Sequence, residues 1–326
     1  MPKNKKTKNS ITKKPRKKLN EPLKIMVNTL RISGSVMVGE HCFEGGHTVP
    51  IYEVTTIHAL NQLIGYAKFI NKAYGDVYYR GECKLHKTLT PSLYRNRVST
   101  SCAENLNELI STISNDYKMK HQLKFDFVDI ESTNATIEGM LQHYGIKTRF
   151  IDVVDNHWVA LWMGLNSNQK IKQIETYNHY SQRSIPLVDF ANGKNCAEED
   201  LFQYILLVAV PGNSKRVNNG IYISDDFMKI DLRQALPSIF LRPHAQHGLV
   251  IRKRPHSGDV KQYDMSNSVI GILKIRIDKS SEWIGGGELL TQENLFPAPA
   301  YDHGYDILLS RDDIFNGADY KIARYV

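Results

Sequence analysis

The chain has 326 residues, 41% hydrophobic and 10% aromatic, which is enough apolar material for a packed core and excludes a wholly disordered protein. Its 42 Lys and Arg exceed its 34 Asp and Glu, but residues 1–24 alone carry nine Lys and one Arg against one Glu. Because residues 25–326 then hold 32 basic and 33 acidic residues, the positive charge belongs to the amino-terminal segment and not to the body.

Residues 1–24 contain almost no large apolar side chains, so we expect a disordered basic tail, with residues 25–326 forming a single domain. Lysines in such a tail can contact phosphates without sequence preference, which favours nucleic acid or another acidic partner. The same composition also fits a solubilising leader that has no specific ligand.

The cysteine pattern and the hydropathy predict a cytoplasmic protein without a membrane segment. No two cysteines form a Cys-x-x-Cys pair, and no secretory apolar segment stands at the amino terminus. Both observations favour reduced thiols. No apolar run approaches the roughly 18 to 20 residues that a bilayer-spanning helix needs.

In chain order, short strands are predicted at Ile25–Ile32 and Val49–Val54, separated by a glycine-rich turn. Thr55 or Thr56 can cap a following helix. The apolar positions of that helix recur with the helical period: Leu60, Leu63, Ile64, Ala67 and Ile70. Asp76–Arg80 then has the pattern of a compact strand.

From about residue 84 to residue 144 the pattern is helical, which predicts a helical lobe inserted before a second strand at Thr148–Val153. A buried helix is predicted at Trp158–Leu165, and the polar stretch Asn166–Asp200 is predicted to be a surface excursion. The remaining apolar segments are predicted strands: Leu201–Val210, Gly220–Ile223, Leu249–Arg252 and Val269–Ile277. Strands with a helical lobe after the first one predict an α+β fold.

Several catalytic motifs are missing from the sequence. Neither phosphate-binding glycine signature is present, although Gly285–Gly287 superficially suggests one, and there is no nucleophile elbow. His41, Cys42 and His47 are near enough to ligate a metal, but a second ligand pair at a recognisable spacing is lacking. We therefore expect no metal site.

Arg80 ends an apolar strand and precedes Gly81, so its guanidinium lies beside a backbone that a ligand can approach closely. An arginine in this position is suited to bidentate capture of a phosphate or carboxylate. The alternative is a structural ion pair with Glu82 or Asp152.

Two further segments predict the lining of a cleft. One places polar residues where a helix ends and the next strand begins: Gln142, His143, Tyr144, Thr148, Arg149 and Asp152, with Gly145 just beyond the helix. The other precedes a later strand: Arg242, Gln246, His247 and Gly248. The alternatives are a helix cap with a buried pair between Arg149 and Asp152, and an ordinary turn.

Together these segments resemble the FRG domain family, named for an aromatic-Arg-Gly motif. The resemblance spans about residues 75–310 and rests on these matches: Tyr79–Gly81, Pro91–Arg95, Gln142–Gly145, Thr148–Asp152, Val159–Trp162, Arg242, Gln246, Gly248 and Leu295–Pro297. The layout of FRG domains is similar to that of ADP-ribosyltransferases, which implies a mixed β core with a helical lobe inserted after the first core strand.

The resemblance also implies roles for individual residues. Arg80 would hold the phosphates or nicotinamide ribose of NAD, the substrate, and Gly81 would offer backbone groups to the carboxamide. The cofactor contacts would come from Tyr79, Arg80, Gly81, His143, Tyr144, Thr148 and Arg149, with Tyr144 stacking on nicotinamide. Arg80, Tyr144 and Gln246 would be the catalytic residues, with Gln246 in the neighbourhood of the catalytic acid. Since an amide cannot act as a base, either Glu288 or Asp152 would supply a carboxylate, or the acceptor would be activated differently.

The leading hypothesis is an NAD-dependent mono-ADP-ribosyltransferase, a bacterial toxin acting in toxin–antitoxin phage defence. It would modify RNA, with mRNA favoured, or otherwise protein, and an antitoxin, with or without a chaperone, would neutralise it. One alternative is a noncatalytic nucleic-acid-binding module that uses the basic tail. Another is a nuclease or nucleotide hydrolase with Asp152 and His143 as acid and base.

Overall fold

The computed structural model describes residues 20–26, 32–95, 100–123, 129–172, 176–185, 198–254, 259–315 and 320–325. Its strands are β1 (Ser35–Cys42), β2 (Thr48–Val54), β3 (Gly75–Glu82), β4 (Ile151–Val154), β5 (Asn166–Lys172), β6 (Thr176–Gln182), β7 (Phe202–Pro211), β8 (Lys215–Asn218), β9 (Ile221–Ile223), β10 (Phe227–Asp231), β11 (Gly248–Lys253), β12 (Val269–Arg276) and β13 (Arg324–Tyr325).

Its α-helices are α1 (Ile57–Asn71), α2 (Thr100–Asn115), α3 (Tyr117–Leu123), α4 (Ile130–His143), α5 (His157–Leu165), α6 (Glu198–Leu201), α7 (Leu232–Ala235), α8 (Arg242–Ala245), α9 (Ile277–Trp283), α10 (Gln292–Leu295) and α11 (His303–Leu309). Short 3-10 helices are η1 (Ser92–Tyr94), η2 (Val260–Tyr263), η3 (Ser266–Ser268) and η4 (Gly285–Gly287).

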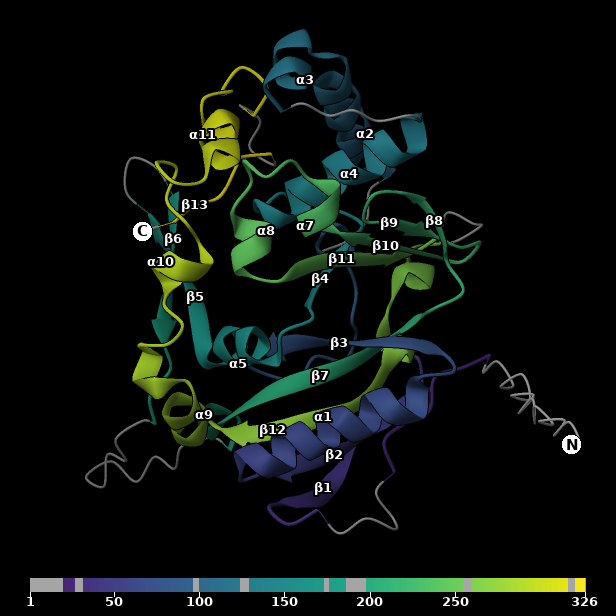
Figure 1. The fold of residues 1–326 in the computed structure, drawn as a ribbon, viewed down its shortest axis with the longest axis vertical. Helices are drawn as coiled ribbons and strands as arrows, with labels where there is room; N and C mark the ends of the chain where they lie inside the picture. Colours follow the sequence, from purple (N-terminus) through teal and green to yellow (C-terminus); the bar gives the residue numbers. More distant parts are fainter. Residues whose placement is uncertain are drawn as a thin grey trace, which may run out of the picture.

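Ten strands form one mixed sheet in the order β1-β2-β12-β7-β3-β4-β11-β10-β9-β8 (Figure 1). Within this sheet, β2 and β12 run parallel, and the other neighbouring strands run antiparallel to one another. A second sheet of three strands, β13-β6-β5, runs along one side of the molecule. The predicted α+β class is therefore confirmed.

Helices α1 and α5 cover one face of the β12–β7–β3 part of the large sheet, as Figure 1 shows. Helix α1 begins at Thr56, whose side chain accepts a hydrogen bond from the Ala59 backbone N–H, and its apolar face is buried as predicted. Helix α5 approaches β3 so closely that a Cβ on Gly81 would stand 1.8 Å from the Ala160 carbonyl oxygen. Glycine is therefore required at position 81 by packing.

Helices α2, α3 and α4 lie between β3 and β4 in the chain and form the predicted helical insertion. Their apolar faces share a core with β10 and β11. Helix α4 crosses β11 at Gly139, where an added Cβ would meet the Val250 side chain at 3.0 Å. The helix ends at His143, and Gly145 follows with φ +97°, a conformation that favours glycine.

Two sequence predictions were wrong. The first strand is β1 and not Ile25–Ile32: residues 25 and 26 are not in a strand, and residues 27–31 lie outside the described residues. The stretch Asn166–Asp200 was expected to be a surface excursion, yet it contains the paired strands β5 and β6. These strands are mostly polar, so hydrophobic periodicity does not reveal them. The tail prediction falls almost wholly on residues 1–19, which also lie outside the described residues.

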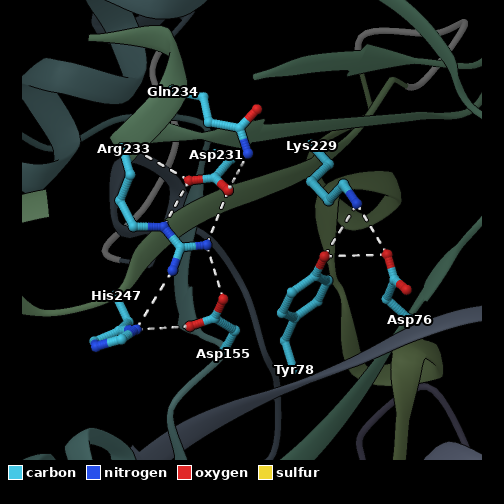
Figure 2. Close-up of polar contacts among 8 residues, drawn as sticks. All are labelled: Asp76, Tyr78, Asp155, Lys229, Asp231, Arg233, Gln234 and His247. Carbon is cyan, nitrogen blue, oxygen red and sulfur yellow. Dashed lines mark hydrogen bonds and ion pairs between the residues drawn. The ribbon is translucent and has the colours of Figure 1, made fainter. Parts of the chain in front are cut away.

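A polar network crosses from β3 to the β4–β11–β10 half of the sheet (Figure 2). Lys229 of β10 donates hydrogen bonds to the Asp76 carboxylate and to the Tyr78 hydroxyl, each at 3.0 Å. Beside it, Arg233 donates to the carboxylates of Asp155 and Asp231 at 2.7 and 2.9 Å. The Lys229 contacts join β10 to β3, whereas the Arg233 contacts lie within the β4–β11–β10 half of the sheet.

Within the part of the chain that the structure describes, no helix combines the length and the apolar composition needed to cross a bilayer.

Candidate functional site

The large sheet is nearly divided between β3 and β4. Strand β3 pairs with β7 along its whole length, but it meets β4 only at Tyr79 and Val154. A cavity of about 490 Å³ lies beside this single pair, toward the carboxyl end of β3 and the amino end of β4, and both Arg80 and Asp152 line it. The fork between the two strands therefore creates a ligand-sized space.

Arg80 bridges the two strands at the fork. Its Nε donates to Glu82 Oε1 at 2.6 Å, and its Nη1 donates to the Asp152 carbonyl oxygen at 2.8 Å. Burial lowers the pKa of Arg80, but the carboxylates of Glu82 and Asp152 outweigh that effect and leave the pKa raised. The guanidinium is thus a fixed cation in the cavity wall, and the Glu82 pairing that the sequence left open is present.

Asp152 is held by residues at the end of α4. Its Oδ2 accepts a hydrogen bond from Gln142 Nε2 at 2.6 Å, and its Oδ1 lies 3.6 Å from His143 Nδ1. Burial raises the pKa of Asp152, but His143, Gln142 and the Arg80 charge outweigh this and bring the pKa below its usual value. The carboxylate is therefore ionised at neutral pH.

Two atoms of this group are buried without a hydrogen-bond partner among the described residues: Asp152 Oδ1 and His143 Nε2. An unpaired buried carboxylate oxygen is costly unless a ligand or water satisfies it. Asp152 Oδ1 has almost no exposed surface and lies beside His143 Nδ1, whereas the Asp152 side chain as a whole is 37% exposed, so a ligand in the cavity can contact this side chain.

A stack of three aromatic rings lines another part of the cavity: Tyr180 of β6, Phe296 after α10, and Tyr325 of β13. The Tyr180 and Phe296 rings lie 4.7 Å apart at 24°, and the Phe296 and Tyr325 rings lie 4.6 Å apart at 28°. Sequence reasoning missed Tyr180 and Tyr325; its one signal for this wall was the Leu-Phe-Pro segment that contains Phe296.

Gln246 lines the cavity and is almost fully buried. Its Nε2 donates to the Leu295 carbonyl oxygen at 2.7 Å, so the side chain holds the segment that leads into Phe296. Gly248 also lines the cavity, and a Cβ there would stand 2.6 Å from His143 Cε1. Both residues of this motif therefore form part of the cavity wall, and each also holds a neighbouring part of that wall in place.

Tyr144 does not line the cavity. It is fully buried, its hydroxyl donates to Asp302 Oδ2 at 2.7 Å, and the Arg242 guanidinium carbon lies 4.3 Å from its ring centroid. The ring is therefore unavailable for the stacking on nicotinamide that the family resemblance implies. A tyrosine at a helix end can face either the core or the cleft, and the Tyr144 ring is buried in the apolar core.

Arg242 and His247 were also expected to point into the cleft, and neither does. The Arg242 guanidinium is fully buried against four aromatic rings and donates to the His143 carbonyl oxygen at 3.2 Å. His247 has φ +51° and joins the network of Figure 2, with Nδ1 3.1 Å from Asp155 Oδ1. Both residues support the site without lining it.

Thr148 and Arg149 lie behind the cavity too. The Thr148 hydroxyl donates to Gln142 Oε1 at 2.7 Å, which orients the amide that holds Asp152. Arg149 makes no pair with Asp152; its Nε and Nη2 donate to the buried Glu138 carboxylate at 2.9 and 2.6 Å. The expected direct contacts of Thr148 and Arg149 with a cofactor are therefore replaced by supporting ones.

The remaining candidates are resolved by position. Glu288 is exposed and does not line the cavity, whereas Asp152 does. His41 and His47 place their Nε2 atoms 2.9 and 2.8 Å from backbone carbonyl oxygens. Among the residues that the structure describes, no group of three His, Cys, Asp or Glu side chains is arranged to hold a metal ion.

Comparison with known families gives a match over part of the chain. Residues 75–173 match the FRG domain. The matched segment runs from the start of β3 past the end of β5, so it contains Arg80, Gln142, His143 and Asp152 but not the aromatic residues 296 and 325. This match supports the family resemblance. Neither the curated proteins nor the solved structures returned a match to the chain.

Proposed function

We propose that this protein is an NAD-dependent mono-ADP-ribosyltransferase. One observation carries the proposal: the cavity combines a fixed cation, an ionised and partly exposed carboxylate, and a cluster of aromatic rings. A cation suits a diphosphate, a carboxylate suits a ribose hydroxyl, and aromatic faces suit a nicotinamide or adenine ring. The volume of about 490 Å³ falls in the usual range for such ligands.

The reaction breaks the bond between C1′ of the ribose and the nicotinamide nitrogen. Nicotinamide leaves with the bonding electron pair, and positive charge develops on the ribose. A nucleophile of the acceptor then forms the new bond to C1′ and gives up a proton. Asp152 would stabilise the positive charge and take that proton, since an ionised carboxylate can do both.

In this assignment Asp152, and not Gln246 or Glu288, supplies the catalytic carboxylate. Gln246 has no basic group, and Glu288 is exposed outside the cavity. Tyr180, Phe296 and Tyr325 take over the stacking role that the resemblance gave to Tyr144. The near-division of the sheet beside the cavity supports an ADP-ribosyltransferase-like arrangement of the fold.

The biological setting is proposed on the family resemblance. The protein would be a cytoplasmic bacterial toxin of a toxin–antitoxin phage-defence system, held in check by an antitoxin with or without a chaperone. Its acceptor would be RNA, with mRNA favoured, or otherwise protein.

The test measures nicotinamide release from NAD with RNA or protein acceptors, and the rise of the melting temperature that NAD causes. We expect Arg80→Ala to abolish the melting-temperature shift. Asp152→Asn should keep NAD binding and slow release by about 10²- to 10⁴-fold, as loss of a general base does. Arg276→Ala, which removes an exposed ion pair, is the control. No release from the wild type, with Arg80→Ala indistinguishable from it, would refute the proposal.

A second candidate is a nucleotide hydrolase, which the neighbouring His143 and Asp152 favour. A hydrolase of this kind would cleave nucleotides or strands without NAD. Strand cleavage without NAD that His143→Ala and Asp152→Asn both abolish would select the hydrolase over the transferase.

A further inference from the structure

A smaller hollow of about 230 Å³ adjoins the cavity. Four residues line both spaces: Glu82, Lys84, His86 and Arg95. Because the two spaces share this wall, we treat the hollow as a side lobe of the cavity. The side lobe is completed by Phe43, Leu85, Thr88, Leu89 and Leu206.

Two permanently charged cations line the side lobe, Lys84 and Arg95. Among the described residues, Glu82 is the one carboxylate in its lining. Glu82 already accepts the hydrogen bond from Arg80 at 2.6 Å, so its charge is largely committed. Burial and the nearby charge of Arg80 lower the pKa of Arg95, and the charges of Glu82 and Asp152 offset this only in part.

The segment that carries these side chains is fixed although it is neither helix nor strand. The Leu89 backbone N–H donates to Asp264 Oδ1 and Ser266 Oγ, at 2.9 and 3.0 Å. The Glu44 backbone N–H donates to the Lys87 carbonyl oxygen at 2.8 Å. These bonds fix the backbone at residues 87 and 89, so a ligand would have to order only the exposed side chains of Lys84 and Arg95.

We propose that the side lobe binds a phosphate group of a single nucleic-acid strand beside the NAD cavity. The strand would be the acceptor, so this role rests on the proposed function, whereas the binding itself does not. A lobe of about 230 Å³ suits part of one strand and not a duplex. Lys84 and Arg95 would contact the phosphate, and the nine lysines of residues 1–24 would attract the same polyanion from outside.

The test uses the full chain and a fluorescein-labelled single-stranded RNA oligonucleotide without NAD. Fluorescence anisotropy gives the affinity over a series of salt concentrations. Each lost phosphate contact should reduce the slope of log affinity against log salt by about 0.7 for a single strand. We expect this reduction for Lys84→Met and for Arg95→Met. Lys87→Met, in the same segment but outside both linings, should leave the slope unchanged.

NAD affinity, measured on the same variants, identifies the phosphate that the lobe recognises. A reduced RNA slope supports the proposal, with or without a smaller loss of NAD affinity, because Lys84 and Arg95 line both spaces. Weakened NAD affinity with an unchanged slope overturns it, because the lobe would then hold the NAD diphosphate. Displacement of the oligonucleotide by an equal concentration of nucleoside monophosphate also overturns it, since the occupant would be a free nucleotide. If nicotinamide is never released but the slope still falls, the lobe stands and the transferase function fails.

Discussion

Glu138 offers a sharp test of the structure because the same helix carries a matched control. Its carboxylate is 1% exposed and receives hydrogen bonds from the backbone and the side chain of Arg149, and Arg252 Nη1 lies 3.6 Å away. Glu138→Gln keeps the shape but leaves two arginines facing an uncharged amide. Removing one partner of a buried ion pair costs about 3 to 5 kcal/mol.

The control is Glu131→Gln, seven residues or about two helix turns away on α4. Glu131 also pairs with an arginine, Arg254, at 2.7 Å, but its side chain is 54% exposed. An exposed ion pair contributes about 0 to 1 kcal/mol. Urea unfolding followed by circular dichroism should therefore show a large loss of the free energy of unfolding for Glu138→Gln and almost none for Glu131→Gln.

The pH dependence gives an independent check on Glu138. Burial raises its pKa, but Arg252 and Arg149 outweigh this and bring the pKa below the usual value. A depressed folded-state pKa stabilises the protein fully above the unfolded pKa of about 4.3 and loses this contribution as pH falls toward the folded pKa. The difference between wild type and Glu138→Gln should therefore shrink in acid. Equal losses for the two variants, or a difference independent of pH, would refute the reasoning.

Two further substitutions test the packing around the fork. Gly81→Ala should lower the free energy of unfolding by about 3 kcal/mol or more, because its Cβ would collide with the Ala160 carbonyl, whereas Gly45→Ala, with open space around it, should change nothing. A folded Gly81→Ala protein with wild-type stability would contradict the close approach of α5. Lys229→Met should cost about 1 to 2 kcal/mol in thermal unfolding, because it leaves the buried Tyr78 hydroxyl short of a charged donor; an unchanged melting temperature would mean that this bridge contributes nothing.

Local signals in the sequence predicted the elements that frame the site. Thr56 and the helical period gave α1, and Gly145 marked the end of α4. The aromatic-Arg-Gly motif located the end of β3. The strand pattern of residues 148–153 placed Asp152 on the next strand. Such signals depend on neighbouring residues alone, so they survive without knowledge of the fold.

The direction of each side chain and the long-range partners could not be predicted in this way. From the sequence, the side chains of Tyr144 and Arg149 could point either into the core or into the cleft. Both point into the core, because Tyr144 bonds to Asp302 and Arg149 bonds to Glu138. These two partners are known only from the folded structure. Tyr325 was missed because its strand has two residues and is recognisable only beside β6. The aromatic wall is therefore a product of tertiary structure.

Strand β12 has a consequence for how the protein reaches its active form. It lies between β2 and β7, so Ile51 neighbours Ile272, which follows 221 residues later in the chain. Such non-local pairing gives a high contact order and slow folding. On the ribosome, β2 and β7 would wait for β12 to emerge, and Tyr325 is added later still. A nascent chain would thus lack both the finished sheet and the aromatic wall of the cavity.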